Sequence, residues 1–306
     1  MLNWSLMALR GRQRASAGCA QWLGLVARLG LVGLVSGCRA HMVTPTKVVA
    51  SFTRQLTLTG KAVPVDFYLP ADVKSAPVVV VAHGFTRSRL NMAGWGGLLA
   101  SNGFIVAIPD LPTLADRDQN GRAIVELLEV MNREGLTAQP KPTGGAALIG
   151  FSMGGLSTLL AAASNGNVRC WIGLDPVESG RRGAQAAASL AIPCAVLRAE
   201  PAAWNLRGNV RRLTQALPGP FLTLCVRGAT HSDPEAPTDG LAELLCGKSN
   251  PQRHGTFERY TVATLRAVFF GDHNAQAALA GAVCDPAVEQ VASRGLEGFA
   301  AQSGRY

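Results

Sequence analysis

The residues best suited to chemistry in this 306-residue chain surround a serine at position 152. Ser152 lies within Gly150-Phe151-Ser152-Met153-Gly154-Gly155, after the apolar run 146–149 and before a helical pattern over 156–163. Glycines on both sides of a serine permit a sharp turn from strand to helix, which strains the serine backbone and exposes its hydroxyl. The pattern therefore predicts a nucleophilic serine at the carboxyl end of a buried strand.

A base for this serine is expected after the last apolar run, 221–226, where His231 follows Gly228 across a short turn. At that edge an imidazole can take the hydroxyl proton and return it to a leaving group. The other histidines fit less well. His83 precedes the serine strand and is expected to shape a loop, and the remaining histidines lie near the N-terminus or in polar segments (His41, His254, His273).

The acid that would orient His231 has more than one candidate. Asp175 directly follows the apolar run 170–174, and Pro176 would stiffen its turn, so Asp175 is favoured. Glu200, after the run 194–197, is the alternative acid, and Glu178 and Asp233 remain open as well. The chain order serine, acid, histidine holds for both Asp175 and Glu200.

The first apolar run, 78–82, ends in a loop that reads His83-Gly84-Phe85-Thr86. Such a loop, together with the residue after the nucleophile, can provide two backbone N–H groups for a developing oxyanion. The expected donors are the amides of Phe85 and Met153.

The elements that must position these residues form a regular pattern. Residues 52–58 and 62–68 alternate as a pair of antiparallel strands, and helical patterns cover 90–101 and 121–134. Six apolar runs separated by helices indicate a mostly parallel central sheet with helices on both faces, which is an α/β fold. They lie at 78–82, 104–108, 146–149, 170–174, 194–197 and 221–226. In such sheets the site lies at the carboxyl ends of the strands.

With these motifs in order, residues 63–232 resemble α/β-hydrolases of the dienelactone hydrolase, cutinase and chlorophyllase-like group. The serine motif is similar to that of bacterial cutinases and polyester hydrolases, whereas Gly173-Leu174-Asp175-Pro176-Val177 is similar to chlorophyllases, whose triad acid is that aspartate. The cutinase-type acid would fall near Ala202, where no carboxylate stands, which favours Asp175 and speaks against a true polyester hydrolase. The resemblance implies the α/β-hydrolase fold and no cofactor.

The first 38 residues differ from the rest. Three arginines (Arg10, Arg12, Arg14), an apolar stretch at 29–35 and the sequence Val35-Ser36-Gly37-Cys38 are similar to a bacterial lipoprotein signal. On this reading Cys38 is lipidated, 39–45 is a tether, and 46–306 is a single domain in the cell envelope. A start at Met7, a plain signal peptide with a periplasmic or secreted product, and an uncleaved anchor remain open.

Charge and cysteines limit other classes of function. The net charge of +9 falls to +5 without the four arginines of residues 1–38, and no basic run interleaved with aromatics indicates nucleic-acid binding. No spacing typical of a metal site occurs in the sequence. Cys170, Cys194 and Cys225 lie in apolar runs, so Cys246 and Cys284 are the predicted disulfide pair in an oxidising compartment.

The sequence thus predicts a lipid-anchored serine hydrolase that cleaves carboxylic esters of short to medium acyl chains through Ser152, His231 and Asp175. Trp95 and Met92, near the predicted oxyanion loop, are candidates for an acyl pocket or for core packing. Two alternatives remain: a non-catalytic, lipid-anchored binding protein on the same scaffold, and a hydrolase of amides, peptides or thioesters.

Overall fold

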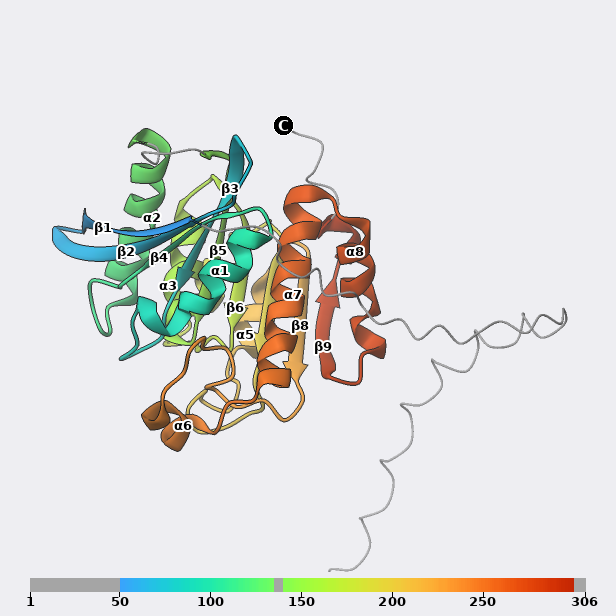
Figure 1. Ribbon diagram of the computed structural model, residues 1–306. Helices are drawn as coiled ribbons and strands as arrows, with labels where there is room; N and C mark the ends of the chain where they lie inside the picture. Colours follow the sequence, from blue (N-terminus) through green and yellow to red (C-terminus); the bar gives the residue numbers. More distant parts are fainter. Residues whose placement is uncertain (1–49, 135–139, 300–306) are drawn as a thin grey trace, which may run out of the picture. The chain divides into compact units, whose positions relative to one another are not determined.

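The centre of the molecule is a nine-stranded sheet in the order β1-β2-β4-β3-β5-β6-β7-β8-β9, counted over the described residues (Figure 1). The computed structural model describes residues 50–134 and 140–299, which lie within the unit Pro45–Tyr306. The predicted signal segment, the tether and Cys38 fall outside the described residues. Among those residues, no helix combines the length and apolarity needed to cross a membrane.

The six predicted apolar runs are the parallel part of this sheet. They form β3 (Ser75–Ala82), β4 (Ile105–Pro109), β5 (Lys141–Phe151), β6 (Val168–Leu174), β7 (Cys194–Arg198) and β8 (Phe221–Val226). Almost every residue of β4 and β6 to β8 is buried, because helices cover both faces. The prediction of a mostly parallel sheet is confirmed.

Antiparallel strands complete both edges. The predicted pair is β1 (Ala50–Leu58) and β2 (Lys61–Leu69), and β2 runs antiparallel to β4. At the other edge, β9 (Val288–Arg294) runs antiparallel to β8 and was not predicted. Its sequence, Val-Glu-Gln-Val-Ala-Ser-Arg, is largely exposed and polar, so it lacks the apolar pattern of the other strands.

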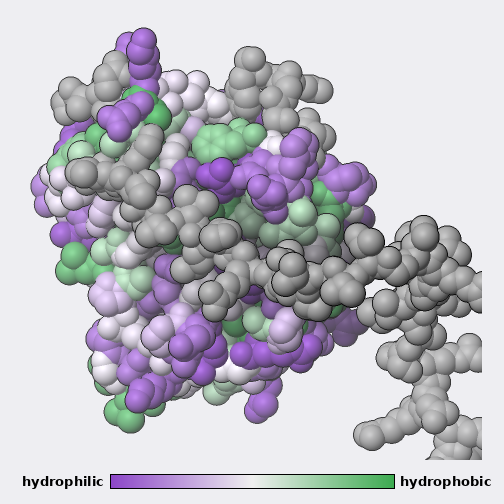
Figure 2. Space-filling model, turned by 45° about the vertical axis from the view of Figure 1, so that its right-hand side comes forward, coloured by the Kyte–Doolittle hydropathy of each residue, from purple (hydrophilic) through white to green (hydrophobic). Residues whose placement is uncertain are grey.

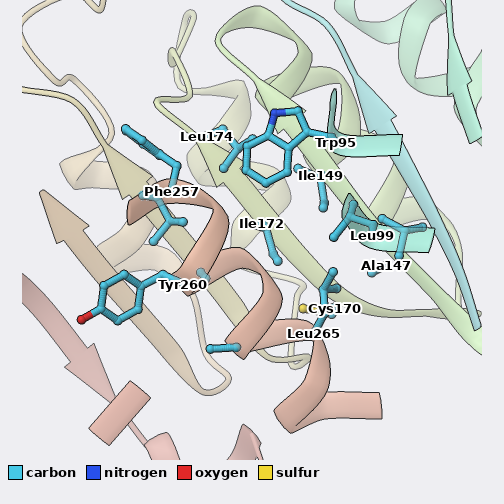
Figure 3. Close-up of a cluster of buried hydrophobic side chains, with 14 of the residues drawn as sticks. Trp95, Leu99, Ala147, Ile149, Cys170, Ile172, Leu174, Phe257, Tyr260 and Leu265 are labelled. Carbon is cyan, nitrogen blue, oxygen red and sulfur yellow. The ribbon is translucent and has the colours of Figure 1, made fainter. Parts of the chain in front are cut away.

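Two hydrophobic cores lie on opposite faces of the sheet, and successive residues of a strand alternate between them, as Val79 and Val80 do. One face carries α2 (Arg117–Glu134), α3 (Met153–Ser164), α4 (Arg182–Ala187) and α5 (Arg211–Ala216). The other carries α1 (Ala93–Ser101), α7 (Pro251–Phe270) and α8 (His273–Ala280). In Figure 3, Trp95 of α1 and Phe257 of α7 pack towards Ile149, Ile172 and Leu174 of the sheet.

Short helices occupy the connections: η1 (Arg89–Met92), α6 (Gly240–Cys246), η2 (Gly281–Cys284) and η3 (Leu296–Phe299). In Figure 1, α6 lies on the side where β8 ends, which is the carboxyl edge of the parallel strands. The segment after β8 therefore lies at the edge where parallel sheets of this kind carry their sites.

The predicted disulfide between Cys246 and Cys284 is wrong, because both thiols are free. Cys246 ends α6, which is attached to the segment after β8 by a hydrogen bond of 3.2 Å from the Thr230 hydroxyl to the Gly247 carbonyl. Cys284 ends η2, which packs against α8 and β9 instead. The two cysteines thus belong to elements anchored at different places, which the sequence pattern alone did not show.

Candidate active site

Ser152 stands at the turn between β5 and α3 with φ 53° and ψ −120°, in the region that residues other than glycine rarely adopt. Backbone hydrogen bonds to β6 and to the loop after it hold the turn in place. The Ser152 amide donates to the Leu174 carbonyl at 3.0 Å, and its carbonyl accepts the Val177 amide at 3.2 Å. The surrounding structure thereby stabilises a strained backbone, as is typical of functional sites.

The glycines around Ser152 are required by close approach. A Cβ on Gly150 would lie 2.3 Å from the Gly154 carbonyl oxygen, and one on Gly154 would lie 2.3 Å from the His83 carbonyl oxygen. A Cβ on Gly155 would lie 2.6 Å from Cβ of Pro176. Glycine at these positions therefore lets α3 start directly against β5 and the loops after β3 and β6.

Three buried side chains from three strand ends form one hydrogen-bonded chain. The Ser152 hydroxyl lies 2.9 Å from His231 Nε2, and His231 Nδ1 lies 2.5 Å from Asp175 Oδ2. Because an ionised Asp175 only accepts, Nδ1 carries the proton that donates to it, and Nε2 is left to accept from the hydroxyl. The exposed fractions of these residues are 8%, 7% and 1%. The geometry can carry a proton away from the serine oxygen.

Asp175 directly follows β6 and is held by further donors. Its amide donates to the Leu197 carbonyl at 2.6 Å, and its Oδ1 accepts the Ala199 amide at 3.0 Å. The side-chain amide of Asn205 donates to Oδ2 at 3.1 Å. The sequence does not indicate a role for Asn205, because an isolated asparagine in a loop has no motif that would single it out.

The other candidate acids have partners of their own. Glu200 is exposed and accepts the Gly228 amide at 3.1 Å. Glu178 accepts the amides of Gly183 and Ala184 at 2.7 and 2.9 Å, so it caps the start of α4. Asp233 is buried and accepts from Arg253 Nε at 2.7 Å. Of these four carboxylates, the one that the structure brings to the His231 ring is Asp175.

The loop after β3 lies directly against the serine. A Cβ on Gly84 would be 3.1 Å from both the Phe151 ring and Cβ of Ser152, so the loop passes at van der Waals distance. The adjacent Phe85 side chain is 54% exposed. On the opposite side of the turn, the Met153 amide opens α3 and has no acceptor within the helix. Both expected amide donors therefore belong to segments that flank Ser152.

His83 fixes the shape of this loop. Its Nε2 accepts the Leu111 amide at 2.9 Å, so the ring is neutral and its Nδ1–H donates to the Gly84 carbonyl at 2.8 Å. Burial lowers the pKa of His83, which favours the same neutral form. His83 makes these contacts with the backbone, which agrees with the predicted loop-shaping role.

The alternative that Trp95 and Met92 line an acyl pocket is wrong. Their exposed fractions are 1% and 0%, and both belong to the core between α1 and the sheet. The indole of Trp95 instead donates to the Pro234 carbonyl at 2.8 Å, which supports the segment that follows His231. Both side chains therefore belong to the packed core.

Arg87 connects the loops on the two sides of the serine. Its guanidinium donates to both oxygens of Glu235 at 2.6 and 2.9 Å and to Asp239 at 2.7 Å. Arg87 lies two residues after Phe85, and Glu235 lies four residues after His231. This bidentate pair, in which Glu235 is buried, ties the loop after β3 to the loop that carries the imidazole.

The described part of the chain contains no group of three or more His, Cys, Asp or Glu side chains arranged to hold a metal ion. The chemistry visible in the geometry is that of a serine hydroxyl, an imidazole and a carboxylate in series.

Comparisons with known proteins place the chain among ester hydrolases of similar sequence. A family model described as PET hydrolase-like matches residues 58–202, which include Ser152 and Asp175 but not His231. The chain is 35% identical over 99 residues to a bis(hydroxyethyl) terephthalate hydrolase from Streptomyces coelicolor, a match that covers 32% of each chain. It is 26% identical over 178 residues to cutinase 1 of Thermobifida cellulosilytica and to a cutinase of Thermobifida fusca. Those matches cover 56% of this chain and 66% and 57% of the relatives. The chain thus spans from about a third to about two thirds of the length of these three relatives.

Proposed function

We propose that the chain is a serine hydrolase of carboxylic esters within the cutinase-like group of α/β-hydrolases, to which it is similar. The observation that carries this proposal is the hydrogen-bonded series from Ser152 through His231 to Asp175 at a strained strand-to-helix turn. His231 lies outside the segment that the family model matches, so its role is supported by geometry.

In the proposed reaction, Ser152 Oγ attacks the ester carbonyl carbon while its proton passes to His231 Nε2. Asp175 accepts the Nδ1–H throughout and stabilises the imidazolium. The carbonyl oxygen becomes an oxyanion, which the amides of Phe85 and Met153 receive. The imidazolium then protonates the alcohol oxygen as the ester C–O bond breaks, leaving an acyl group on Ser152. Water, deprotonated by His231, hydrolyses that acyl-enzyme and restores the serine.

Short to medium acyl chains are the proposed substrates. The names of the relatives add two further candidates, a terephthalate diester and cutin-type esters. The proposed acid, Asp175, directly follows β6 and does not lie near Ala202, where the cutinase-type acid is expected, so the substrate preference has to be measured rather than transferred.

The full chain tests the proposal on p-nitrophenyl acetate, butyrate, octanoate and palmitate, with bis(hydroxyethyl) terephthalate as a further substrate. We expect hydrolysis with kcat/KM highest at acetate to octanoate, and a loss of more than about 10³-fold in Ser152→Ala and His231→Ala. Ester hydrolysis that persists unchanged in folded Ser152→Ala would contradict the proposal.

The amide and thioester alternatives are separated by matched substrates that differ only in the leaving group. An N-acyl p-nitroanilide and an acyl thioester of the preferred chain length serve for this comparison. We expect the oxygen ester to have the highest kcat/KM relative to its uncatalysed hydrolysis. A higher enhancement for either of the others would reassign the substrate class.

We also propose that residues 1–38 direct the protein to the cell envelope and that Cys38 carries a lipid. The support is the sequence pattern. Metabolic labelling of bacteria with an alkyne fatty acid should label the wild-type chain, and Cys38→Ala should abolish the label. An unlabelled wild-type chain in the soluble fraction would contradict the anchor.

A further inference from the structure

Asn205 is a fully buried side chain whose every polar atom has a partner. It lies in the loop between β7 and α5 and has an exposed fraction of 0%. Its Nδ2 donates to Asp175 Oδ2 at 3.1 Å, with Oδ1 at 3.4 Å, and to the Glu200 carbonyl at 2.8 Å. Its Oδ1 accepts the amides of Ala202 and Gly208 at 2.8 and 3.1 Å. A buried amide with both its donors and its acceptor in use specifies one geometry.

The bond from Asn205 to Asp175 reaches a buried carboxylate, whereas the other bonds of Asn205 go to backbone groups of the loop. Asp175 is 1% exposed, so its carboxylate receives little stabilisation from water and depends on donors in the protein. Oδ1 of Asp175 accepts a hydrogen bond from the Ala199 amide. Oδ2, the oxygen that faces His231, has the imidazole and the Asn205 amide. Asn205 therefore acts on the same oxygen that orients the base.

The position of Asn205 also explains how the triad acid can follow β6, although the loop after β7 lies close by. The loop after β7, which begins at Ala199, provides no carboxylate to His231, since Glu200 is directed to the Gly228 amide. That loop instead sends the Asn205 amide across to Asp175, and so contributes a donor in place of an acid.

We propose that Asn205 is a positioning residue of the triad: its amide holds Asp175 aligned on His231 while its carbonyl oxygen fixes the loop. The inference rests on the proposed function, because the triad is what Asn205 positions. The hydrogen bonds of the Asn205 side chain go to Asp175 and to loop backbone groups, and none of them goes to Ser152 or His231. When the Ser152 proton reaches His231 Nε2, the imidazolium stays paired with an Asp175 that cannot turn away.

Asn209 is a matched control in the same loop. Its side chain makes a comparable pair of bonds, accepting the Glu178 amide and donating to the Glu178 carbonyl, each at 3.0 Å. These bonds are to backbone groups rather than to the acid. The pair Asn205→Ala and Asn209→Ala therefore separates triad positioning from general support of the loop.

The first experiment measures p-nitrophenyl butyrate hydrolysis by the full chain. The concentration of competent active sites is determined by titration with a fluorophosphonate. We expect Asn205→Ala to lower kcat about 10- to 100-fold per competent site with KM changed less than about threefold, because misplacement of the acid acts on the chemical step. Asn209→Ala should remain within about threefold of wild type. Equal losses in the two variants, or an unchanged kcat in Asn205→Ala, would overturn the proposal.

The second experiment uses Asn205→Asp, which preserves shape and the acceptor oxygen. The new carboxyl can replace the amide donor while it is protonated, but once ionised it repels Asp175. Burial and the neighbouring charge raise its pKa, so the change falls within the assay range. We expect the ratio of variant to wild-type kcat/KM to fall at least about tenfold between about pH 6 and about pH 9. The ratio for Asn205→Ala should stay flat.

A flat ratio for a folded Asn205→Asp enzyme would show that the donor to Asp175 is immaterial, and the inference would fail. Circular dichroism at each pH confirms that the variant is folded. Failure of the proposed function looks different, because then wild type itself has no activity that depends on Ser152, whatever the Asn205 variants do.

Discussion

At the level of single residues, backbone donors decide which carboxylate serves the imidazole. Asp175 has its own amide bonded to β7 and its Oδ1 bonded to the Ala199 amide, so its second oxygen faces His231. Glu178 uses its two oxygens on α4, and Glu200 is exposed. Residue type alone would allow several acids, and the local hydrogen bonds select one.

Asp175→Asn is expected to lower kcat of ester hydrolysis by about 10³- to 10⁴-fold, because an amide at this position no longer stabilises the imidazolium. Glu200→Gln should remain within about threefold of wild type, since Glu200 bonds to a loop amide. Steady-state kinetics on p-nitrophenyl butyrate checks both. An active Asp175→Asn enzyme together with an inactive Glu200→Gln enzyme would reverse the assignment.

His83 makes stability depend on pH. Burial lowers the pKa of His83 in the folded state below its ordinary value of 6.5, so the unfolded chain binds the proton more readily. The contribution of His83 to stability is thus present above about pH 6.5 and lost as pH falls from there through the folded pKa. His83→Gln, which cannot titrate, should show a smaller loss of Tm between pH 7.5 and pH 5. An identical pH dependence of Tm in the two proteins would contradict this assignment.

The serine and histidine were predictable because a motif or a strand end marks each of them. Asp175 was predicted as the favoured acid, with Glu200 left open, and the structure brings Asp175 to the imidazole. Asn205 and Arg87 were not found, because their partners are distant in sequence. Asn205 lies 30 residues from Asp175, and Arg87 lies 148 residues from Glu235. Contacts of this kind depend on the fold rather than on local sequence.

At the level of elements, close packing of α3 against β5 sets the position of the nucleophile. Gly150 and Gly154 meet where the helix begins, and the Thr158 hydroxyl lies in the same contact. The strand, the turn and the helix act together as one support for Ser152.

Gly150→Ala is expected to lower the free energy of unfolding by at least about 1–3 kcal/mol, the usual cost of overpacking, and to remove activity. The reason is that the added Cβ would lie 2.3 Å from the Gly154 carbonyl oxygen. Gly97→Ala is the matched control. Gly97 lies inside α1 with nothing within 4 Å of a Cβ, so alanine there should stabilise by about 0.5–1 kcal/mol. Urea unfolding measures both. A Gly150→Ala protein as stable and active as wild type would refute this explanation.

Strands with continuous apolar runs were predicted well, whereas β9 and the disulfide were not. A buried strand has to be apolar on both faces, so its sequence is distinctive. An edge strand such as β9 is half-exposed and needs no such pattern. The separation of Cys246 and Cys284 depends on how α6 and η2 are anchored, which cysteine spacing does not report.

At the level of the whole molecule, the two cores pack on either side of the sheet and fix the positions of its six parallel strands. The triad residues follow three of these strands. The surface is mixed: the face in Figure 2 shows hydrophilic residues interspersed with small apolar patches. Several leucines are exposed, among them Leu244 of α6 with an exposed fraction of 81%.

Leu265→Ala is expected to lower the free energy of unfolding by about 2–5 kcal/mol, because Leu265 of α7 is fully buried against the sheet (Figure 3). Leu244→Ala should change it by less than about 0.5 kcal/mol, since that side chain is already in water. Chemical denaturation compares the two. Similar losses in both variants would mean that the packing of α7 does not stabilise the fold as described.

The central claim is that the Ser152 hydroxyl is activated by His231 and Asp175, and covalent labelling tests it most directly. The full chain is incubated with a fluorophosphonate, and the adduct is located by peptide mass spectrometry. We predict one adduct per chain at Ser152, formed much more slowly in His231→Ala and absent in Ser152→Ala. Labelling of folded Ser152→Ala at the wild-type rate, or no labelling of the wild-type protein, would contradict the account.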